Sequence, residues 1–142
     1  MQTFLPVPSF TATAKILDKK RLFKQLVESR QILACLGVNV KKNDGTPFKA
    51  GWKNHPCCKM WKGYEIALMK YHNDILVECI ERGIKTKIKP FLISISSVRL
   101  PPFIGNKKFH DSHKSNLLRK KKEYYNKYMW SVPDNIEYVW EI

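Results

Sequence analysis

A glutamate surrounded by cations is the first feature of this 142-residue sequence that could do chemistry. Glu28 is the only acid between Lys19 and Leu36, a helix-like segment that otherwise carries several lysines and arginines. On a helix of 3.6 residues per turn it lies about 200° from Leu26, so it points away from the core. Its face also carries Lys20, Arg21 and Lys24. The pattern fits either a solvated face, with Glu28 paired to Lys24, or a catalytic carboxylate on a surface that binds a polyanion.

A second group of residues mixes cations with aromatic rings between residues 119 and 130. Cations neutralise phosphates and release counterions, and aromatic faces stack on unpaired bases at roughly 1 to 3 kcal/mol each. The alternative is a solvated helix end followed by tyrosines of the core. From this segment we predict DNA contacts by Arg119, Lys120, Tyr124, Tyr125 and Tyr128.

Histidines form the third group. His110 and His113 lie three positions apart, but no Glu or Cys stands nearby at metal spacing, so we predict no metal site. Contact with a DNA phosphate is the better interpretation for one of them, together with Lys114, Ser115 and Asn116. His55 precedes Pro56 and is either a helix cap or a DNA contact. The sequence contains no glycine-rich phosphate loop and no Ser-His-Asp set.

The overall charge agrees with a polyanionic partner. The sequence has 26 Lys and Arg against 12 Asp and Glu, a formal net charge of +14. Nucleic acid is favoured over an anionic membrane surface, because no apolar run approaches the roughly 18 residues of a spanning helix. The first residues lack the basic and apolar regions of a secretion signal. We expect an intracellular protein that is not secreted, in the cytoplasm of a prokaryote or virus-infected cell or in the nucleus.

The binding partner that we expect is double-stranded DNA, with no membrane, no obligate protein partner and a monomeric chain. The four cysteines do not have the spacing of a zinc motif or of a disulfide framework, so we interpret them as reduced thiols, mostly in the core. No cofactor is predicted.

The elements that must position these side chains are mostly helices. We expect an extended arm over residues 1–8, because Pro6 and Pro8 prevent a long helix there. Helices are predicted from about residue 12 to Leu36, from 56 to Arg82 and from His110 to about Lys122, with Gly37 and Gly83 as stops for the first two. The connections are long and irregular, with a possible strand at 91–95, and the tail from Ser131 packs back as a cover. The predicted fold is therefore mainly α: a single compact domain over residues 1–142 with three principal helices.

Two stretches of the second helix resemble a known family. These are His55-Pro-Cys-Cys-Lys-Met-Trp-Lys-Gly63 and Leu76-Val-Glu-Cys-Ile-Glu-Arg-Gly83, which are similar to the central helix of the pyrimidine-dimer DNA glycosylase, or endonuclease V, family. The resemblance covers nearly the whole chain. It is closest to a bacterial and viral branch that starts Met-Gln-Thr-Phe-Leu-Pro and contains Ser-His-Lys-Ser-Asn-Leu-Leu-Arg-Lys.

The resemblance implies an enzyme that bends duplex DNA at an ultraviolet lesion and extrudes a nucleotide. In the family an N-terminal α-amine attacks the sugar C1′ to form a Schiff base, and a glutamate on the first helix assists glycosyl transfer and β-elimination. Glu28 corresponds to that glutamate. Basic DNA contacts correspond to Lys20, Arg21, Lys24 and Arg30, and Gln2 of the arm is a further expected DNA contact.

The sequence departs from the family pattern at two places. Gln2 is large enough that we expect Met1 to be retained, so Met1 would supply the amine, or a lysine such as Lys15 or Lys19 would replace it. Val27 and Gln31 stand where the family has arginines.

We predict a DNA glycosylase with abasic-site lyase activity. The alternatives are the same chemistry on another damaged or modified base, or a non-catalytic DNA-binding protein.

Overall fold

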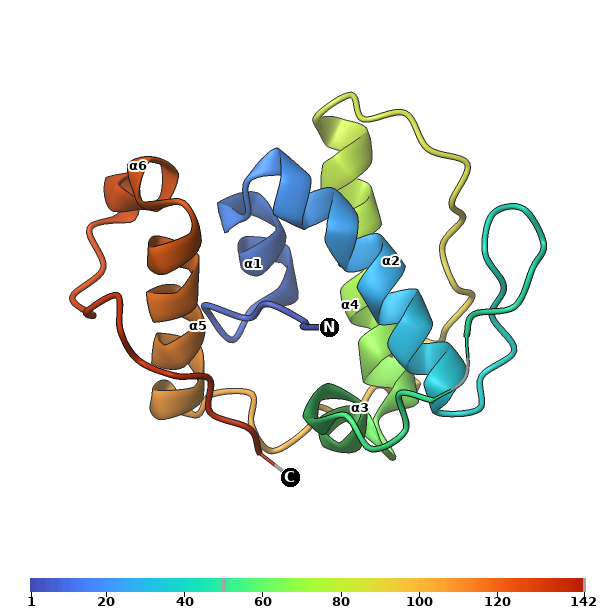
Figure 1. The fold of residues 1–142 in the computed structure, drawn as a ribbon. Helices are drawn as coiled ribbons and strands as arrows, with labels where there is room; N and C mark the ends of the chain where they lie inside the picture. Colours follow the sequence, from blue (N-terminus) through green and yellow to red (C-terminus); the bar gives the residue numbers. More distant parts are fainter. Residues whose placement is uncertain (50, 142) are drawn as a thin grey trace.

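A computed structural model describes residues 1–49 and 51–141. These residues form helices and irregular connections without a β-strand, as the mainly α prediction requires (Figure 1). The long helices are α2 (Lys19–Cys35), α4 (Glu65–Glu81) and α5 (Lys107–Lys120). Shorter elements are α1 (Phe10–Ile16), α3 (Pro56–Trp61), α6 (Lys122–Tyr125) and the 3-10 turns η1 (Ile95–Ser97) and η2 (Asn126–Tyr128). No helix in this part of the chain is long and apolar enough to span a membrane.

The first predicted helix is interrupted, so the prediction of one helix from 12 to Leu36 was wrong. Leu17 and Asp18 have extended backbones between α1 and α2. The Asp18 N–H donates to the Tyr125 hydroxyl at 3.0 Å, and that hydroxyl donates in turn to the Asp18 carboxylate. Because a residue more than a hundred positions away makes these contacts, the local sequence, which has no Pro or Gly here, gives no sign of the break.

The second predicted helix is also divided, at Lys62 and Gly63, into α3 and α4. Gly63 has a φ of 88°, which glycine adopts without strain. At the start of α3, His55 is the N-cap, because its Nδ1 accepts the Cys57 N–H at 3.1 Å. The predicted cap role of His55 is therefore confirmed, as is the stop of α4 at Gly83, which has a φ of 76°.

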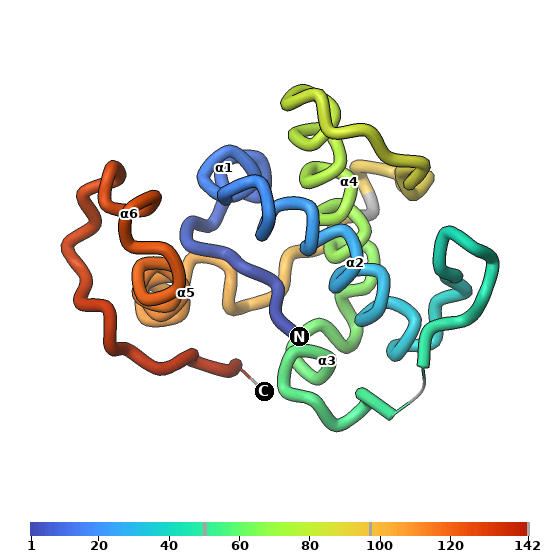
Figure 2. Tube along the Cα trace, turned by 45° about the horizontal axis from the view of Figure 1, so that its top comes forward, coloured from blue at the N-terminus to red at the C-terminus, as the bar shows by residue number. Residues whose placement is uncertain are grey.

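The core lies where α2 and α4 pack along each other, with α1 against α4 (Figures 1 and 2). Leu22 and Leu26 of α2 are fully buried, as are Tyr71 and Ile75 of α4. The Trp61 ring is also fully buried and lies 6.2 Å from that of Tyr71 between centroids. The aromatic stripe of the second predicted helix is thus core rather than an exposed stacking surface.

The segment between α4 and α5 contains no strand, which corrects the expectation for residues 91–95. Asn73 of α4 instead satisfies the backbone of Phe91: its amide donates to the Phe91 carbonyl and its oxygen accepts the Phe91 N–H, both at 2.8 Å. One side chain thus replaces the partner strand that a β-ladder would need.

The C-terminal tail covers α5, as predicted. The Ile136 N–H donates to the Ser115 hydroxyl at 2.9 Å, and the Val139 N–H donates to the Ser112 hydroxyl at 3.1 Å. Asn116 donates to the Ile136 carbonyl at 3.1 Å. In both ribbon views the tail runs beside α5, and the N-terminal arm, residues 1–8, passes between α5 and the α2–α4 pair.

Candidate active site

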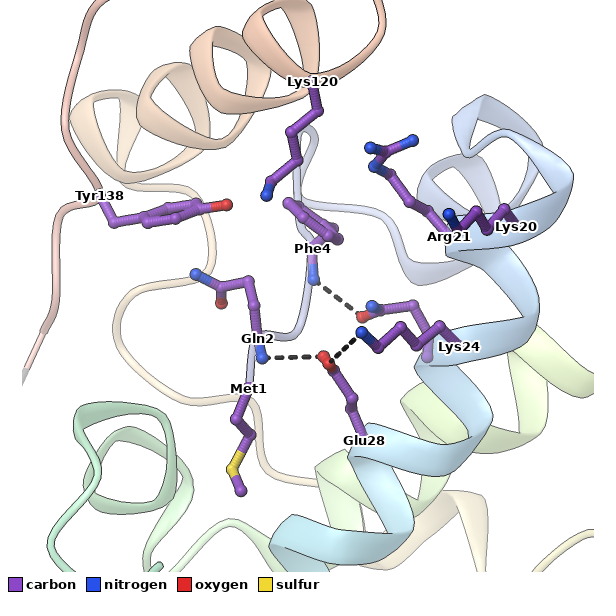
Figure 3. Close-up of a pocket in the computed structure, with 10 residues that line it drawn as sticks. Met1, Gln2, Phe4, Lys20, Arg21, Lys24, Glu28, Lys120 and Tyr138 are labelled. Atoms are coloured by element: carbon purple, nitrogen blue, oxygen red, sulfur yellow. Dashed lines mark hydrogen bonds and ion pairs between the residues drawn. The ribbon is translucent and has the colours of Figure 1, made fainter.

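A cleft of about 360 Å³ opens where the N-terminal arm crosses α2 (Figure 3). Its walls come from three parts of the chain: the arm, the outer face of α2, and the C-terminal end of α5 with the tail. The lining residues are Met1, Gln2, Phe4, Lys20, Arg21, Lys24, Gln25, Glu28, Lys120 and Tyr138. The structure therefore brings together both predicted catalytic residues and five of the predicted DNA contacts, Gln2, Lys20, Arg21, Lys24 and Lys120.

Glu28 sits in the wall of this cleft rather than on an exposed face. Only 9% of the residue is exposed, so the structure does not fit the alternative of a solvated face. It does point away from the α2–α4 core, as the helix geometry predicted, but the arm lies over it. The Gln2 N–H donates to its Oε2 at 2.8 Å, and the Lys24 ammonium lies 3.9 Å from its Oε1.

Side chains of α2, α3 and α4 hold the arm in place. The Phe4 N–H donates to the Gln25 amide oxygen at 2.9 Å, and the Tyr71 hydroxyl lies 2.8 Å from the Phe4 carbonyl oxygen and 2.7 Å from the same Gln25 oxygen. The Trp61 indole N–H donates to the Thr3 hydroxyl at 3.0 Å. These contacts fix the backbone two residues from the one that touches Glu28.

The two α5 histidines hold the next peptide of the arm. The Leu5 N–H donates to His113 Nδ1 at 2.9 Å, and His110 Nδ1 lies 2.7 Å from the Leu5 carbonyl oxygen. Because the Gly105 N–H donates to His110 Nε2 at 2.8 Å, the His110 proton is on Nδ1 and is donated to Leu5. Both imidazoles are therefore neutral. Burial lowers the pKa of His113 to about 3 and also lowers that of His110.

This placement corrects the interpretation of the histidines as phosphate contacts. His113 is fully buried and His110 is 5% exposed, and both rings bind backbone groups of the protein. Ser115, Asn116 and Tyr125 are buried too, and their polar groups bind the tail and Asp18. The physical reason is the same for all five residues. Their side chains face the arm, the tail or the corner between α1 and α2, and the local sequence does not predict where these segments lie.

The remaining predicted DNA contacts lie outside the cleft. Arg119 is exposed and donates to the Asp134 carbonyl at 2.8 Å, and Lys114 lies 3.7 Å from Asp111. Tyr124 and Tyr128 are half-buried, and the Tyr128 ring stacks on Trp130 with centroids 5.2 Å apart. His55 and Arg30 also lie outside the lining of the cleft.

The Met1 end of the arm turns toward α3. Its thioether lies 3.8 Å from the Cys58 thiol. Burial, and then the positive α-amine of Met1, lower the pKa of His55. Within the described residues no ion pair joins the amine to Glu28, whose arm partner is the Gln2 nitrogen. Lys15 and Lys19, the predicted substitutes, do not line the cleft.

Comparison with known proteins adds one match. The family model described as pyrimidine dimer DNA glycosylase matches residues 1–90, which include the arm, α2 with Glu28, and α4. The chain belongs to this family. No curated protein and no solved structure matches it. As a member of the pyrimidine dimer DNA glycosylase family, the chain is a DNA repair glycosylase at the family level, and its substrate is DNA.

Membership in the glycosylase family gives the cleft a context, because eight of its ten lining residues lie in the matched segment. Sequence reasoning missed Gln25 and Tyr71, which hold the arm. Gln25 is 1% exposed and lies between Leu22 and Leu26 on the apolar side of α2. A glutamine on an apolar stripe was the available signal, since a buried amide needs a partner.

The described residues contain no group of three His, Cys, Asp or Glu side chains that could hold a metal ion. All four cysteines are free, and Cys57, Cys58 and Cys79 are buried, as expected for core thiols. Burial raises the pKa of Cys57 to about 11, which keeps that thiol protonated at neutral pH.

Proposed function

We propose that this glycosylase removes pyrimidine dimers from duplex DNA and cleaves the strand at the resulting abasic site, through a Schiff base formed by its N-terminal α-amine. The observation that carries the proposal is the contact of 2.8 Å between the Gln2 nitrogen and the Glu28 carboxylate, inside a cleft lined by lysines and an arginine. It supports the proposal because it brings the first peptide of the chain to this carboxylate.

The chemistry suits an α-amine. Such amines ordinarily have a pKa near 8 and lysines near 10.4, so at pH 7 roughly a tenth of the former but only about one in 2,500 of the latter is an unprotonated nucleophile. Attack forms an N–C1′ bond while the glycosidic bond breaks and its electron pair leaves with the base. The sugar ring then opens to the imine.

Glu28 has two tasks in this scheme. Its carboxylate stabilises positive charge on the sugar and then takes the C2′ proton, after which the 3′ phosphate leaves in the β-elimination. Lys20, Arg21, Lys24 and Lys120 line the same cleft and neutralise the phosphates on either side of the sugar. The exposed positions of Lys20, Lys24 and Lys120 support this role.

The position of the amine depends on Met1. If Met1 is retained, as the size of Gln2 predicts, the amine lies one residue beyond the Glu28 contact. If Met1 is removed, the Gln2 nitrogen becomes the α-amine at the atom that already lies 2.8 Å from Glu28 Oε2. In that form the amine and the carboxylate would be in direct contact.

Borohydride trapping tests the proposal. Reduction during reaction with irradiated and with abasic duplexes should give a covalent adduct on both, which peptide mapping places on the first residue of the chain. No adduct with either duplex would overturn the lyase mechanism. An adduct that persists after the N-terminus is blocked would move the nucleophile to a lysine of the cleft, such as Lys24.

A second candidate is the same chemistry on another damaged or modified base. Val27 is 43% exposed, so α2 presents an apolar side chain where the family resemblance implies an arginine, and Gln31 is also uncharged. Trapping on abasic but not on irradiated duplexes would favour this candidate. A non-catalytic DNA-binding protein would bind both duplexes and never nick them.

A further inference from the structure

A second cationic surface lies on the other side of α2 from the tail and α5. It is a groove of about 490 Å³ between the loop of residues 38–49 and the segment of residues 84–91, both of which run beside α2 in the ribbon views (Figures 1 and 2). Its lining residues are Arg30, Asn39, Lys41, Lys42, Asn43, Lys87, Ile88 and Lys89. This groove shares no residue with the Glu28 cleft.

The backbone of each wall of the groove holds its lysines in solvent. Residues 85–89 have no regular secondary structure, and along them the exposed lysines alternate with more buried side chains. Ile88 is 9% exposed and anchors the segment, which leaves Lys87 and Lys89 exposed on either side of it. On the opposite wall Val40 is 8% exposed and anchors the loop, and Lys41 and Lys42 follow it into solvent.

Arg30 joins both walls to α2. Its guanidinium donates to the Lys41 carbonyl at 2.8 Å and lies 5.9 Å from the centre of the Phe91 ring. Val27, Phe48 and Ile88 line a small apolar hollow beside the groove, so both walls also border a shared apolar surface. The lysines therefore belong to backbone segments that these contacts hold in place, rather than to a loop without contacts.

The charge in the groove is unbalanced. Five of its eight lining residues are cations and none is an acid, within the part of the chain that the structure describes. None of Lys41, Lys42, Lys87 and Lys89 forms an ion pair among those residues, whereas Lys24 of the Glu28 cleft lies near an acid. Four exposed ammonium groups around one hollow repel one another, and a row of phosphates relieves that repulsion.

We infer that this groove binds the phosphate backbone of duplex DNA beside the lesion, so that the DNA crosses α2 and contacts the protein on both sides of that helix. The inference rests on the proposed function, since it extends the DNA contact from the Glu28 cleft. Arg30, which the sequence suggested as a DNA contact, holds the walls of the groove.

The test measures the salt dependence of binding to a duplex with a reduced abasic site, which cannot form a Schiff base. A variant with Lys41→Gln, Lys42→Gln, Lys87→Gln and Lys89→Gln should bind more weakly. The slope of its log K against log salt should fall by about 0.9 for each phosphate that the variant no longer neutralises. The matched control carries Lys53→Gln, Lys59→Gln, Lys62→Gln and Lys108→Gln, four exposed lysines that line neither the groove nor the Glu28 cleft. Its slope should change much less.

Duplexes shortened on one side of the lesion give the second readout. The penalty of the groove variant should disappear on the duplex that no longer reaches the groove and persist on the other. Equal slopes for the two variants, with the parent binding and cleaving DNA, would overturn the groove and leave the proposed function intact. Weaker binding of the groove variant to anionic vesicles, with unchanged DNA binding, would also overturn it and assign the lysines to a membrane surface. A parent that binds no DNA would overturn both.

Discussion

At the scale of single residues, Glu28 combines features that rarely occur together on a helix surface. It accepts an N–H from the arm, lies 3.9 Å from a lysine ammonium, and borders a cleft that solvent enters. A carboxylate in such a place can stabilise a cationic sugar and accept a proton without a movement of α2.

Replacing Glu28 with glutamine tests this role. Glu28→Gln keeps the length of the side chain and an acceptor for the Gln2 N–H but removes the charge and the base. We expect strand cleavage to fall by about 10²- to 10⁴-fold, in a gel-based nicking assay. DNA affinity, measured by fluorescence anisotropy, should stay the same or rise, because a negative charge leaves a cationic cleft.

Glu81→Gln is the matched control, since Glu81 is exposed at the end of α4 and lines no part of the cleft. Its cleavage and affinity should both equal those of the parent. Full cleavage by Glu28→Gln would contradict the catalytic assignment and favour a DNA-binding role alone.

The residue types near Glu28 could be predicted from sequence, and the burial could not. Helical periodicity placed Glu28 and Lys24 on one face, and that placement is right. What covers that face is the arm, whose path depends on Gln25, Tyr71 and His113 in three different helices. Such a path depends on tertiary contacts, which helical periodicity does not predict.

At the scale of elements, the arm forms one wall of the Glu28 cleft. Helices α2, α4 and α5 each contribute side chains that bind its backbone, so its conformation follows from their packing. The geometry of the Glu28 cleft therefore depends in part on Tyr71 and His113, which do not line it.

Tyr71→Phe removes one of these supports. The hydroxyl is fully buried against the Phe4 carbonyl and the Gln25 amide, so we expect a decrease of about 1 to 3 kcal/mol in the free energy of unfolding. Cleavage under single-turnover conditions should fall more than DNA affinity, because the arm near Glu28 loosens. Urea unfolding and nicking rates measure the two effects.

Tyr64→Phe serves as the comparison, because Tyr64 is half-buried beside α4 and its hydroxyl makes no hydrogen bond within the described residues. It should match the parent in both measurements. If Tyr71→Phe became less stable but kept a normal ratio of cleavage to affinity, the arm would not need this support for catalysis.

The elements themselves could be predicted in type but not in continuity. The three long helices were visible as apolar periodicity, and Gly37 and Gly83 marked two ends. The break at Leu17 and Asp18 was not visible, because Tyr125 stabilises it from the other end of the chain. The break at Gly63 had a local signal, since glycine within a helical pattern weakens it.

At the scale of the whole molecule, three buried histidines tie stability to pH. Burial lowers the pKa of His113 to about 3 and that of His72 to about 4, and it lowers the pKa of His110 as well. The unfolded chain binds protons at these rings near pH 6.5, whereas the folded chain does not. Their contribution to stability is therefore complete above about pH 6.5 and is lost as the pH falls toward the folded pKa values.

We expect the free energy of unfolding to fall between pH 6.5 and 4 by about 1.4 kcal/mol per pH unit for each histidine that stays neutral in the folded state. Urea unfolding at constant ionic strength measures this slope. His72→Gln should make the slope shallower, because that ring no longer titrates in the unfolded chain. An unchanged slope in this variant would show that other groups control the pH dependence.

The contacts at Leu5 fix the point from which the length of the arm is measured. Both polar groups of that residue are held by histidines, and only two residues separate it from the nitrogen that meets Glu28. One extra residue in an extended chain would move the terminus by about 3.3 Å, more than the length tolerance of a hydrogen bond. Under the proposed chemistry, an extra residue ahead of Leu5, from another start codon or from a purification tag, would abolish catalysis. It would leave the fold and the DNA affinity unchanged.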